Sequence, residues 1–243
     1  KHEGCPKHKV FVIPNGVDVD RFRPCGPDPQ LAASIGLPAG APCAAIVAAL
    51  RPEKNHGLFL NAAALAAKQV PESRYLVIGD GALRPQLEQQ ARDLGIADRV
   101  LFLGTRSDIP QLLALTRALV LSSHMEANPV SILEGLACEK PVVATRVGSI
   151  PETVHDGISG YLTPPGDAAQ MADRLVQFLQ DPELSEAMGI AGRNHVVNNW
   201  SLARMVSGYQ DLIQTTYLYK LSATATSEGG LARSQSVDPV KSR

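Results

Sequence analysis

Two carboxylates, Glu126 and Glu134, stand on either side of a predicted helix start and are the side chains best placed to do chemistry. Asn128 and Pro129 predict an N-cap and a first-turn proline, so the helix should begin at Pro129, with Glu126 in the preceding loop. Glu134 follows Leu133 on the shoulder of an apolar stripe, which predicts a half-buried carboxylate. Such a charge needs a partner, either a sugar hydroxyl, a backbone amide or a cation. The free amides of the first helical turn could also hold a phosphate.

The segments that must position these carboxylates alternate between apolar strands and amphipathic helices. Strands are predicted at 44–50, 75–78, 100–103, 118–121 and 141–144, and helices at 56–69, 84–94, 109–115, 129–138, 151–154, 167–179, 182–198 and 201–219. Continuously apolar strands joined by helices indicate an α/β fold, a doubly wound parallel sheet covered on both faces. Ligands of such a sheet bind outside the carboxyl ends of its strands, so the loops after the strands matter most.

Cations occupy the first of these loops. Arg51 and Lys54 precede the helix at 56–69, where they could meet a phosphate, although Lys54 could equally form a solvated surface pair with Glu53. The loop after 75–78 begins Gly-Asp-Gly but has Arg84 where a dinucleotide-binding motif has its third glycine, which argues against a nicotinamide or flavin site. Arg106 could stack on a base or face solvent.

Composition narrows the functional classes. The chain has 243 residues and a net charge of -1, which gives no general attraction to nucleic acid or to anionic membranes. It contains no apolar run of ~18 residues, so we expect a soluble, cytoplasmic protein. The cysteines share no short metal-ligand spacing, and free thiols are predicted at Cys5, Cys25, Cys43 and Cys138.

Six short motifs stand in a fixed order within residues 8–219. They are Val12-Ile-Pro-Asn-Gly-Val-Asp18, Leu50-Arg-Pro-Glu-Lys-Asn-His56, Val77-Ile-Gly-Asp-Gly-Ala-Leu83, the Glu126 and Glu134 pair, Lys140-Pro-Val-Val-Ala-Thr145, and Gly148-Ser-Ile-Pro-Glu152 with Asp156-Gly-Ile-Ser-Gly-Tyr-Leu162. Together they resemble family 4 glycosyltransferases of the GT-B fold. In that family the motifs belong to the C-terminal, Rossmann-like domain, which binds the sugar nucleotide and follows an N-terminal acceptor-binding domain.

The resemblance implies a domain organisation. Residues 1–23, with a short predicted strand at 10–13, would be the end of an N-terminal domain that is otherwise absent. Residues 24–42 are a predicted linker rich in proline, glycine and alanine, with one helical turn at 30–35. The nucleotide-sugar-binding domain would span 43–200 and a crossover helix 201–220. Residues 221–243 have too few apolar side chains to pack and are predicted to be disordered.

The resemblance also implies an activity. The chain would be the donor half of a retaining hexosyltransferase, which moves a sugar from a nucleotide diphosphate to a sugar or lipid-linked acceptor without metal or cofactor. The alternative is an isolated nucleotide-sugar-binding module without transferase activity. Alone, the chain is expected to be inactive. Peripheral contact with the inner membrane face, through the absent domain, stays open.

The family's site residues map onto this sequence one by one. Lys54 would neutralise the donor diphosphate, Glu126 would stand beside the donor sugar, and Glu134 would accept hydrogen bonds from both ribose hydroxyls. The backbone around sugar and phosphate would come from Asn128, Pro129, Val130 and Ser131. The family often has an arginine within a Gly-Arg-Leu run, where this chain has Ala48-Ala49-Leu50. Strand alternation suggests that Arg51 serves the same phosphate instead.

Overall fold

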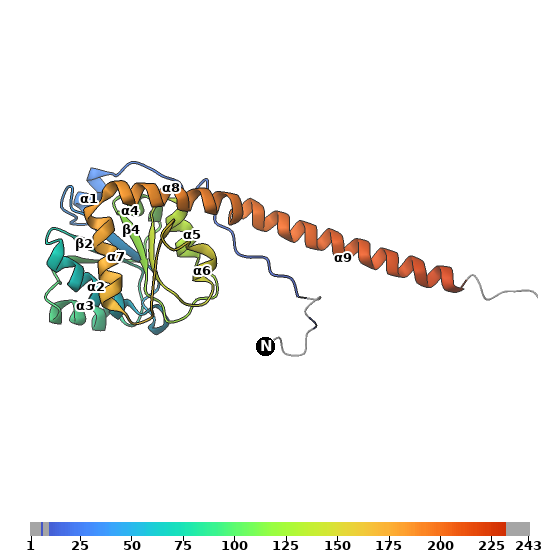
Figure 1. The fold of residues 1–243 in the computed structure, drawn as a ribbon, viewed down its shortest axis with the longest axis horizontal. Coiled ribbons are helices and arrows are strands. Elements are labelled where there is room, and N and C mark those ends of the chain that lie inside the picture. Colours follow the sequence, from blue (N-terminus) through green and yellow to red (C-terminus); the bar gives the residue numbers. More distant parts are fainter. Residues whose placement is uncertain (1–5, 7–9, 232–243) are drawn as a thin grey trace, which may run out of the picture. The chain divides into compact units, whose positions relative to one another are not determined.

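Six strands form a single parallel sheet in the order β3-β2-β1-β4-β5-β6 in the computed structural model, which describes residue 6 and residues 10–231, with side chains as far as Leu221 (Figure 1). The strands are β1 (Cys43–Val47), β2 (Arg74–Ile78), β3 (Val100–Gly104), β4 (Ala118–Leu121), β5 (Val142–Thr145) and β6 (Gly160–Thr163). The strand order reverses between β1 and β4. The loops after these two strands therefore run to opposite sides of the sheet, which is where ligands bind in folds of this kind. The predicted doubly wound α/β fold is confirmed.

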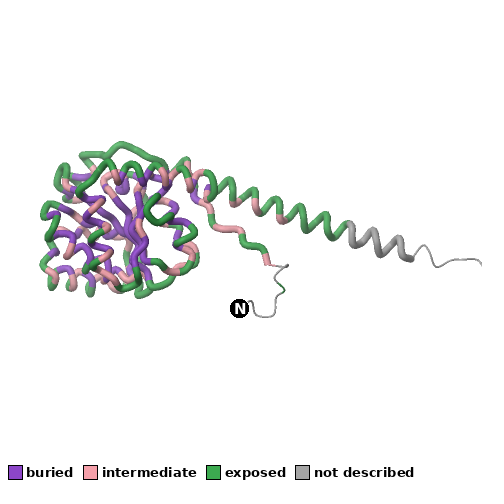
Figure 2. The backbone as a smooth tube through the Cα atoms, in the orientation of Figure 1, coloured by how far each residue is buried: buried purple, intermediate pink, exposed green. Residues whose placement is uncertain are grey.

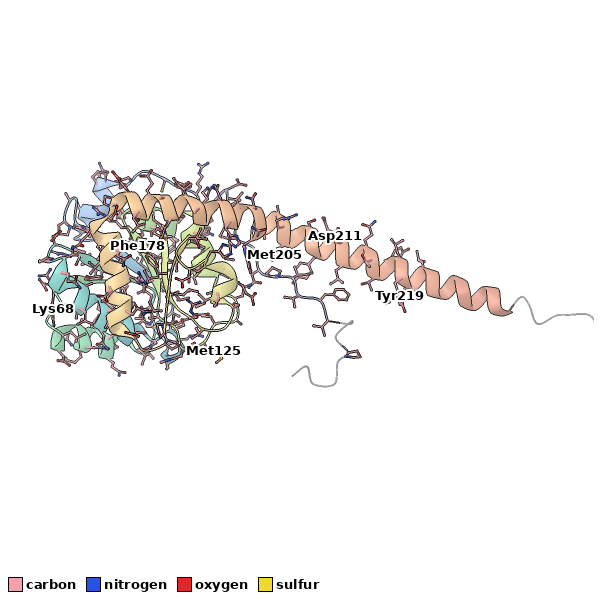
Figure 3. The ribbon with its side chains drawn as sticks, in the orientation of Figure 1. Lys68, Met125, Phe178, Met205, Asp211 and Tyr219 are labelled. Atoms are coloured by element: carbon pink, nitrogen blue, oxygen red, sulfur yellow. The ribbon has the colours of Figure 1, made fainter. Side chains whose placement is uncertain are left out.

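Helices cover both faces of the sheet. They are α1 (Pro29–Ser34), η2 (Pro52–Lys54), α2 (His56–Gln69), α3 (Arg84–Asp93), α4 (Ile109–Ala114), α5 (Val130–Ala137), α6 (Ile150–Thr153), α7 (Ala168–Gln180), α8 (Pro182–Asn199) and α9 (Leu202–Leu231). Side chains alternate along the strands, so Val120 packs with α2 and α7, whereas Leu119 and Leu121 pack with α5. Phe178 of α7 is fully buried (Figure 3). Figure 2 shows the strands as the most continuously buried part of the chain.

The strand predicted at 44–50 is observed as β1 (Cys43–Val47), and three larger differences separate the predicted elements from the structure. Residues 10–13 carry no strand, and Val12 is 87% exposed. No neighbouring strand within the described residues offers these residues a ladder, and an apolar run alone is not a strand without one. The strand β6 was not predicted, because it has four residues and begins with a glycine. The last helix continues to Leu231, beyond its predicted end at Tyr219. Residues 232–243 of the predicted tail lie outside the described residues.

Several other predictions are confirmed. The helical turn in the linker is α1, and Asp167 caps α7 by accepting from the Gln170 amide at 2.9 Å. Cys25, Cys43 and Cys138 are free thiols, while Cys5 lies outside the described residues.

None of the described helices combines the length and apolar character needed to cross a bilayer. The chain divides into two compact units: Pro14–Leu202 holds the sheet with its covering helices, and the second contains Lys1–Ile13 and Ala203–Arg243.

Candidate functional site

The loops after β1 and β4 are joined where the strand order reverses. The His124 amide donates to the Glu53 carbonyl at 2.9 Å. The buried Ser122 hydroxyl lies within hydrogen-bonding distance of two carbonyls of the same loop, those of Asn55 at 2.9 Å and Lys54 at 3.1 Å. These contacts hold the two loops together from both sides, so the side chains that follow are fixed relative to each other.

Lys54 and Glu126 meet at this junction. The Lys54 Nζ donates to Glu126 Oε1 at 2.6 Å, and the side chains are 25% and 7% exposed. Lys54 ends the short helix η2, and Asn55 then takes a left-handed conformation with φ of 48°, which turns the chain into α2. The alternative pair of Lys54 with Glu53 is not formed. The structure therefore brings together two of the predicted site residues that are far apart in the sequence.

A second contact holds the Glu126 carboxylate. The Ser123 hydroxyl donates to the same Oε1 at 2.6 Å, and Ser123 is fully buried. The Thr145 hydroxyl, at the end of β5, donates to the Ser123 carbonyl at 2.6 Å. No hydrogen bond joins Glu126 Oε2 to any residue of the described chain, so the protein holds one carboxylate oxygen and leaves the other without a hydrogen-bond partner there.

The loop after β5 packs directly on the Glu126 backbone. Gly148 has a φ of 52°, and a Cβ added there would lie 1.7 Å from the Glu126 carbonyl oxygen. The Ser149 amide donates to that carbonyl at 3.3 Å. Only glycine permits this approach, so Gly148 fixes the third side of the site.

The start of α5 differs from the prediction by one residue. The helix begins at Val130, and Pro129, with extended backbone angles, is the N-cap. Asn128 is then one position too early to cap, and its Oδ1 is buried without a hydrogen-bond partner in the described part of the chain. The Val130 and Ser131 amides are the first of the helix and have no intrahelical acceptor. These unpaired groups face a region where an anion would be stabilised.

Glu134 is half buried in the second turn of α5, as predicted. Removal from water raises the pKa of its carboxyl group, and the charge of Arg21 acts in the opposite direction. Its carboxylate has no hydrogen bond or ion pair with the described residues, so the partner that its burial calls for is not supplied by this part of the protein.

Arg51 is exposed and makes no side-chain hydrogen bond or ion pair within the described chain. A cavity of about 320 Å³ opens nearby, at the carboxyl ends of β1, β2 and β3, and is lined by Ala48, Gly79 and Arg106 among others. The Arg106 guanidinium is held by both oxygens of Asp108, at 2.8 and 2.5 Å. This pairing fixes Arg106 at the cavity wall.

Sequence reasoning missed His56, the first residue of α2. Its ring is buried, and neither ring nitrogen meets the geometry of a hydrogen bond within the described residues. Burial lowers the pKa of His56 to about 4; the Ala48 carbonyl opposes this shift and the charge of Lys54 adds to it. A neutral imidazole thus lies beneath the loop that carries Lys54. The signals in the sequence were its place at the end of the Leu50–His56 motif and its position two residues after that lysine.

Comparison with known proteins decides the family. Residues 28–195 match the family described as glycosyl transferases group 1. The chain belongs to the group 1 glycosyltransferases. Within that family, the N-acetyl-alpha-D-glucosaminyl L-malate synthase of Bacillus anthracis is 37% identical over 141 residues, which cover 58% of this chain and 37% of that protein. The GDP-mannose-dependent alpha-(1-6)-phosphatidylinositol monomannoside mannosyltransferase of Mycolicibacterium smegmatis is 30% identical over 230 residues, which cover 86% of this chain and 59% of that protein. The chain spans about half the length of the curated relatives it matches.

Solved structures have the same fold. Anabaena HepE in complex with UDP and glucose superposes with a TM-score of 0.76 at 27% identity, over 88% of this chain and 58% of that one. The C-terminal domain of the group 1 family protein LpcC from Francisella tularensis gives a TM-score of 0.70 at 27% identity, over 77% of this chain and 100% of that one. The second structure is a domain solved by itself.

Proposed function

We propose that this chain is the donor-binding half of a retaining glycosyltransferase that uses a nucleotide diphosphate sugar. The observation that carries the proposal is the meeting of Lys54 with Glu126 where the strand order reverses, next to the open amides of α5. A cation and helix amides together can stabilise the negative charge that grows on a departing diphosphate. In this proposal the stabilisation comes from the protein's own groups.

Each site residue then has a role in binding the donor. Lys54 contacts the diphosphate, together with the Val130 and Ser131 amides. Glu126 Oε2 accepts from a hydroxyl of the sugar. Glu134, half buried and without a partner in the described chain, accepts from the ribose hydroxyls. This arrangement differs from a glycosidase, whose two carboxylates act as acid and nucleophile on one bond, because Glu126 is already tied to a lysine.

The remaining predicted residues also find places in this proposal. Asn128 and Pro129 shape the turn into α5, and Asn128 Oδ1, buried and without a hydrogen-bond partner in the described chain, would accept from a hydroxyl or amide of the sugar nucleotide. Arg51 is exposed, and it approaches the phosphates from the solvent side. The cavity beside Ala48 and Arg106 takes the base. HepE was solved with UDP and glucose, and the mycobacterial relative is GDP-mannose-dependent, so the base and the sugar differ among similar proteins.

Transfer requires a second domain in this proposal. The acceptor, a sugar or a lipid-linked sugar, would bind an N-terminal domain, and the two domains would form the cleft in which donor and acceptor meet. Support comes from the relatives, of which this chain covers about half, and from α9. Val206, Tyr209, Ile213 and Tyr217 of that helix recur at helical spacing and are 44, 50, 67 and 62% exposed. Such an apolar face is suited to packing against another domain.

The test is a binding screen on the 243-residue chain. UDP, GDP, UDP-glucose, GDP-mannose, uridine and guanosine are titrated, with thermal unfolding as a second readout. A ligand at 100 times its Kd adds about 2.7 kcal/mol of stability. Lys54→Ala should weaken the binding of nucleoside diphosphates more than that of nucleosides, because the lost group is a charge that faces phosphate. Lys68→Ala, in the last turn of α2, the helix that follows Lys54 (Figure 3), is the matched control and should change the binding of neither ligand class.

Three results would count against the proposal. If the chain binds none of these ligands, the proposed donor-site function is wrong. Equal losses for nucleosides and diphosphates in Lys54→Ala would remove the assigned role of the lysine. Sugar transfer by the isolated chain, shown to be monomeric, would remove the requirement for a second domain. Binding without transfer is the expected result for this chain.

A further inference from the structure

The two oxygens of the Glu126 carboxylate have different environments. Oε1 accepts from both Lys54 Nζ and Ser123 Oγ, each at 2.6 Å, whereas Oε2 has no partner in the described chain. A carboxylate on a loop can rotate about its terminal bond, and because its two oxygens are equivalent, the rotation matters through the plane of the group and the direction of the second oxygen. Two donors on one oxygen fix that plane and direction, because charge-assisted hydrogen bonds are short and strong.

Ser123 is itself held in place from two sides. Its side chain is fully buried two residues after the end of β4, and its carbonyl accepts from the Thr145 hydroxyl at 2.6 Å. Thr145 ends β5, the neighbouring strand, and is also buried. The hydroxyl that reaches Glu126 therefore projects from a peptide unit that the sheet orients. The tip of the same loop is different, since Met125 is 73% exposed (Figure 3).

We infer that Ser123 is a positioning residue that commits Oε1 of Glu126 to Lys54 and leaves Oε2 to accept from the bound sugar. Lys54 has three N–H donors, and the pair with Glu126 uses one of them. The other two stay available for phosphate oxygens. Ser123 thus links the phosphate contact and the sugar contact through one carboxylate. The ligand part of this inference rests on the proposed donor-binding function, and the ion-pair part does not.

The first experiment tests the ion pair without any ligand. Lysines of the wild type and of Ser123→Ala are acetylated with an amine-reactive ester, and the rate at Lys54 is followed by peptide mass spectrometry. Ser123→Ala frees the carboxylate to rotate, so Lys54 should react about threefold faster or more. Thr145→Val, which keeps the shape and removes the hydroxyl, should act in the same direction.

Ser73→Ala is the matched control. Ser73 is also fully buried, and its hydroxyl donates to the Val70 carbonyl at 2.7 Å and lies 2.8 Å from the Tyr75 hydroxyl. It precedes β2, at the opposite end of the sheet from the site. Its loss should lower the melting temperature without changing the reactivity of Lys54. An unchanged Lys54 rate in Ser123→Ala, in protein that is still folded, overturns the inference.

The second experiment measures the preference for a sugar. The affinity of UDP-glucose is divided by that of UDP, and the affinity of GDP-mannose by that of GDP. In Ser123→Ala the ratio for the pair that binds should fall about tenfold, with a smaller loss for the diphosphate. A ratio equal to that of the wild type overturns the role of Oε2. If the wild type binds neither sugar nucleotide, the proposed function fails, and the Lys54 labelling rate alone decides the inference.

Discussion

The ion pair between Lys54 and Glu126 allows a direct energetic test of the site. Lys54→Met removes the charge and keeps the length of the side chain, and Glu126→Gln keeps the shape and removes the negative charge. At 2.6 Å, Coulomb's law with an effective dielectric constant of about 20 gives a gross attraction of about 6 kcal/mol. Most of this is offset by the loss of hydration of both groups.

The net magnitude follows from burial. Exposed pairs contribute about 0.2–1 kcal/mol, and removing one member of a fully buried pair costs about 3–5 kcal/mol. Because the Glu126 side chain is 7% exposed and that of Lys54 is 25% exposed, the pair lies between these two cases. We expect Lys54→Met to cost about 2 kcal/mol, since it leaves a buried carboxylate with only the Ser123 hydroxyl.

The assay is a double-mutant cycle from urea unfolding of the wild type, both single variants and the double variant. The double variant should be more stable than the sum of the single losses predicts by about 1–2 kcal/mol. Arg146→Ala is the control, because Arg146 pairs with Asp156 with both side chains about half exposed. It should cost less than about 1 kcal/mol. A coupling energy near zero, with Lys54→Met no more costly than Arg146→Ala, would refute the geometry of the site.

Three further predictions concern single features. Glu134→Gln should weaken the binding of ribonucleotides more than that of 2'-deoxyribonucleotides, since a neutral amide accepts hydrogen bonds less strongly than a carboxylate. An equal loss of affinity for both in titration calorimetry would make Glu134 a packing residue. His56 has a pKa of 6.5 in the unfolded chain and about 4 in the folded one. Between these two pH values the imidazole is protonated in the unfolded chain and neutral in the folded one. Stability should therefore fall as the pH drops from 6.5 towards 4, by up to about 1.4 kcal/mol per pH unit, and unfolding of His56→Gln should lack this contribution, whereas the same slope in both proteins would contradict it. Amides of α9 around Tyr209 and Ile213 should exchange faster than those around the buried Phe59 of α2; slow exchange in a proven monomer would show that α9 packs within this chain.

The parallel sheet and the edge that carries the site were predictable from the sequence. Continuous apolar runs joined by helices specify a parallel sheet, and the carboxyl ends of its strands lie along one edge. Lys54 and Glu126 follow such strands, so their loops lie at the same edge, but their contact also depends on β1 and β4 being neighbours in the sheet, which the apolar pattern does not specify. The pairing of their charges was not predictable, because it depends on the turn at Asn55 and on a distance of a few ångströms.

Other features were hidden for identifiable reasons. Asn128 and Pro129 had the residue types of an N-cap and a first helical position, but the backbone of Pro129 is extended and moves the helix start by one residue. Ser123 is a small polar residue at a strand end, where serine commonly serves as a turn residue. Its contact with Glu126 depends on burial, which periodicity does not reveal for a single polar position.

The neutral state of the ion pair has a kinetic consequence. Because Glu126 balances Lys54 before any ligand arrives, a diphosphate in solution experiences little long-range attraction from this pair. The exposed Arg51 and the open end of α5 supply the attraction that remains. The association rate constant of a nucleotide diphosphate should then depend only weakly on ionic strength. The affinity of the site would be expressed chiefly in slow release, after the ligand has taken the free N–H groups of the lysine.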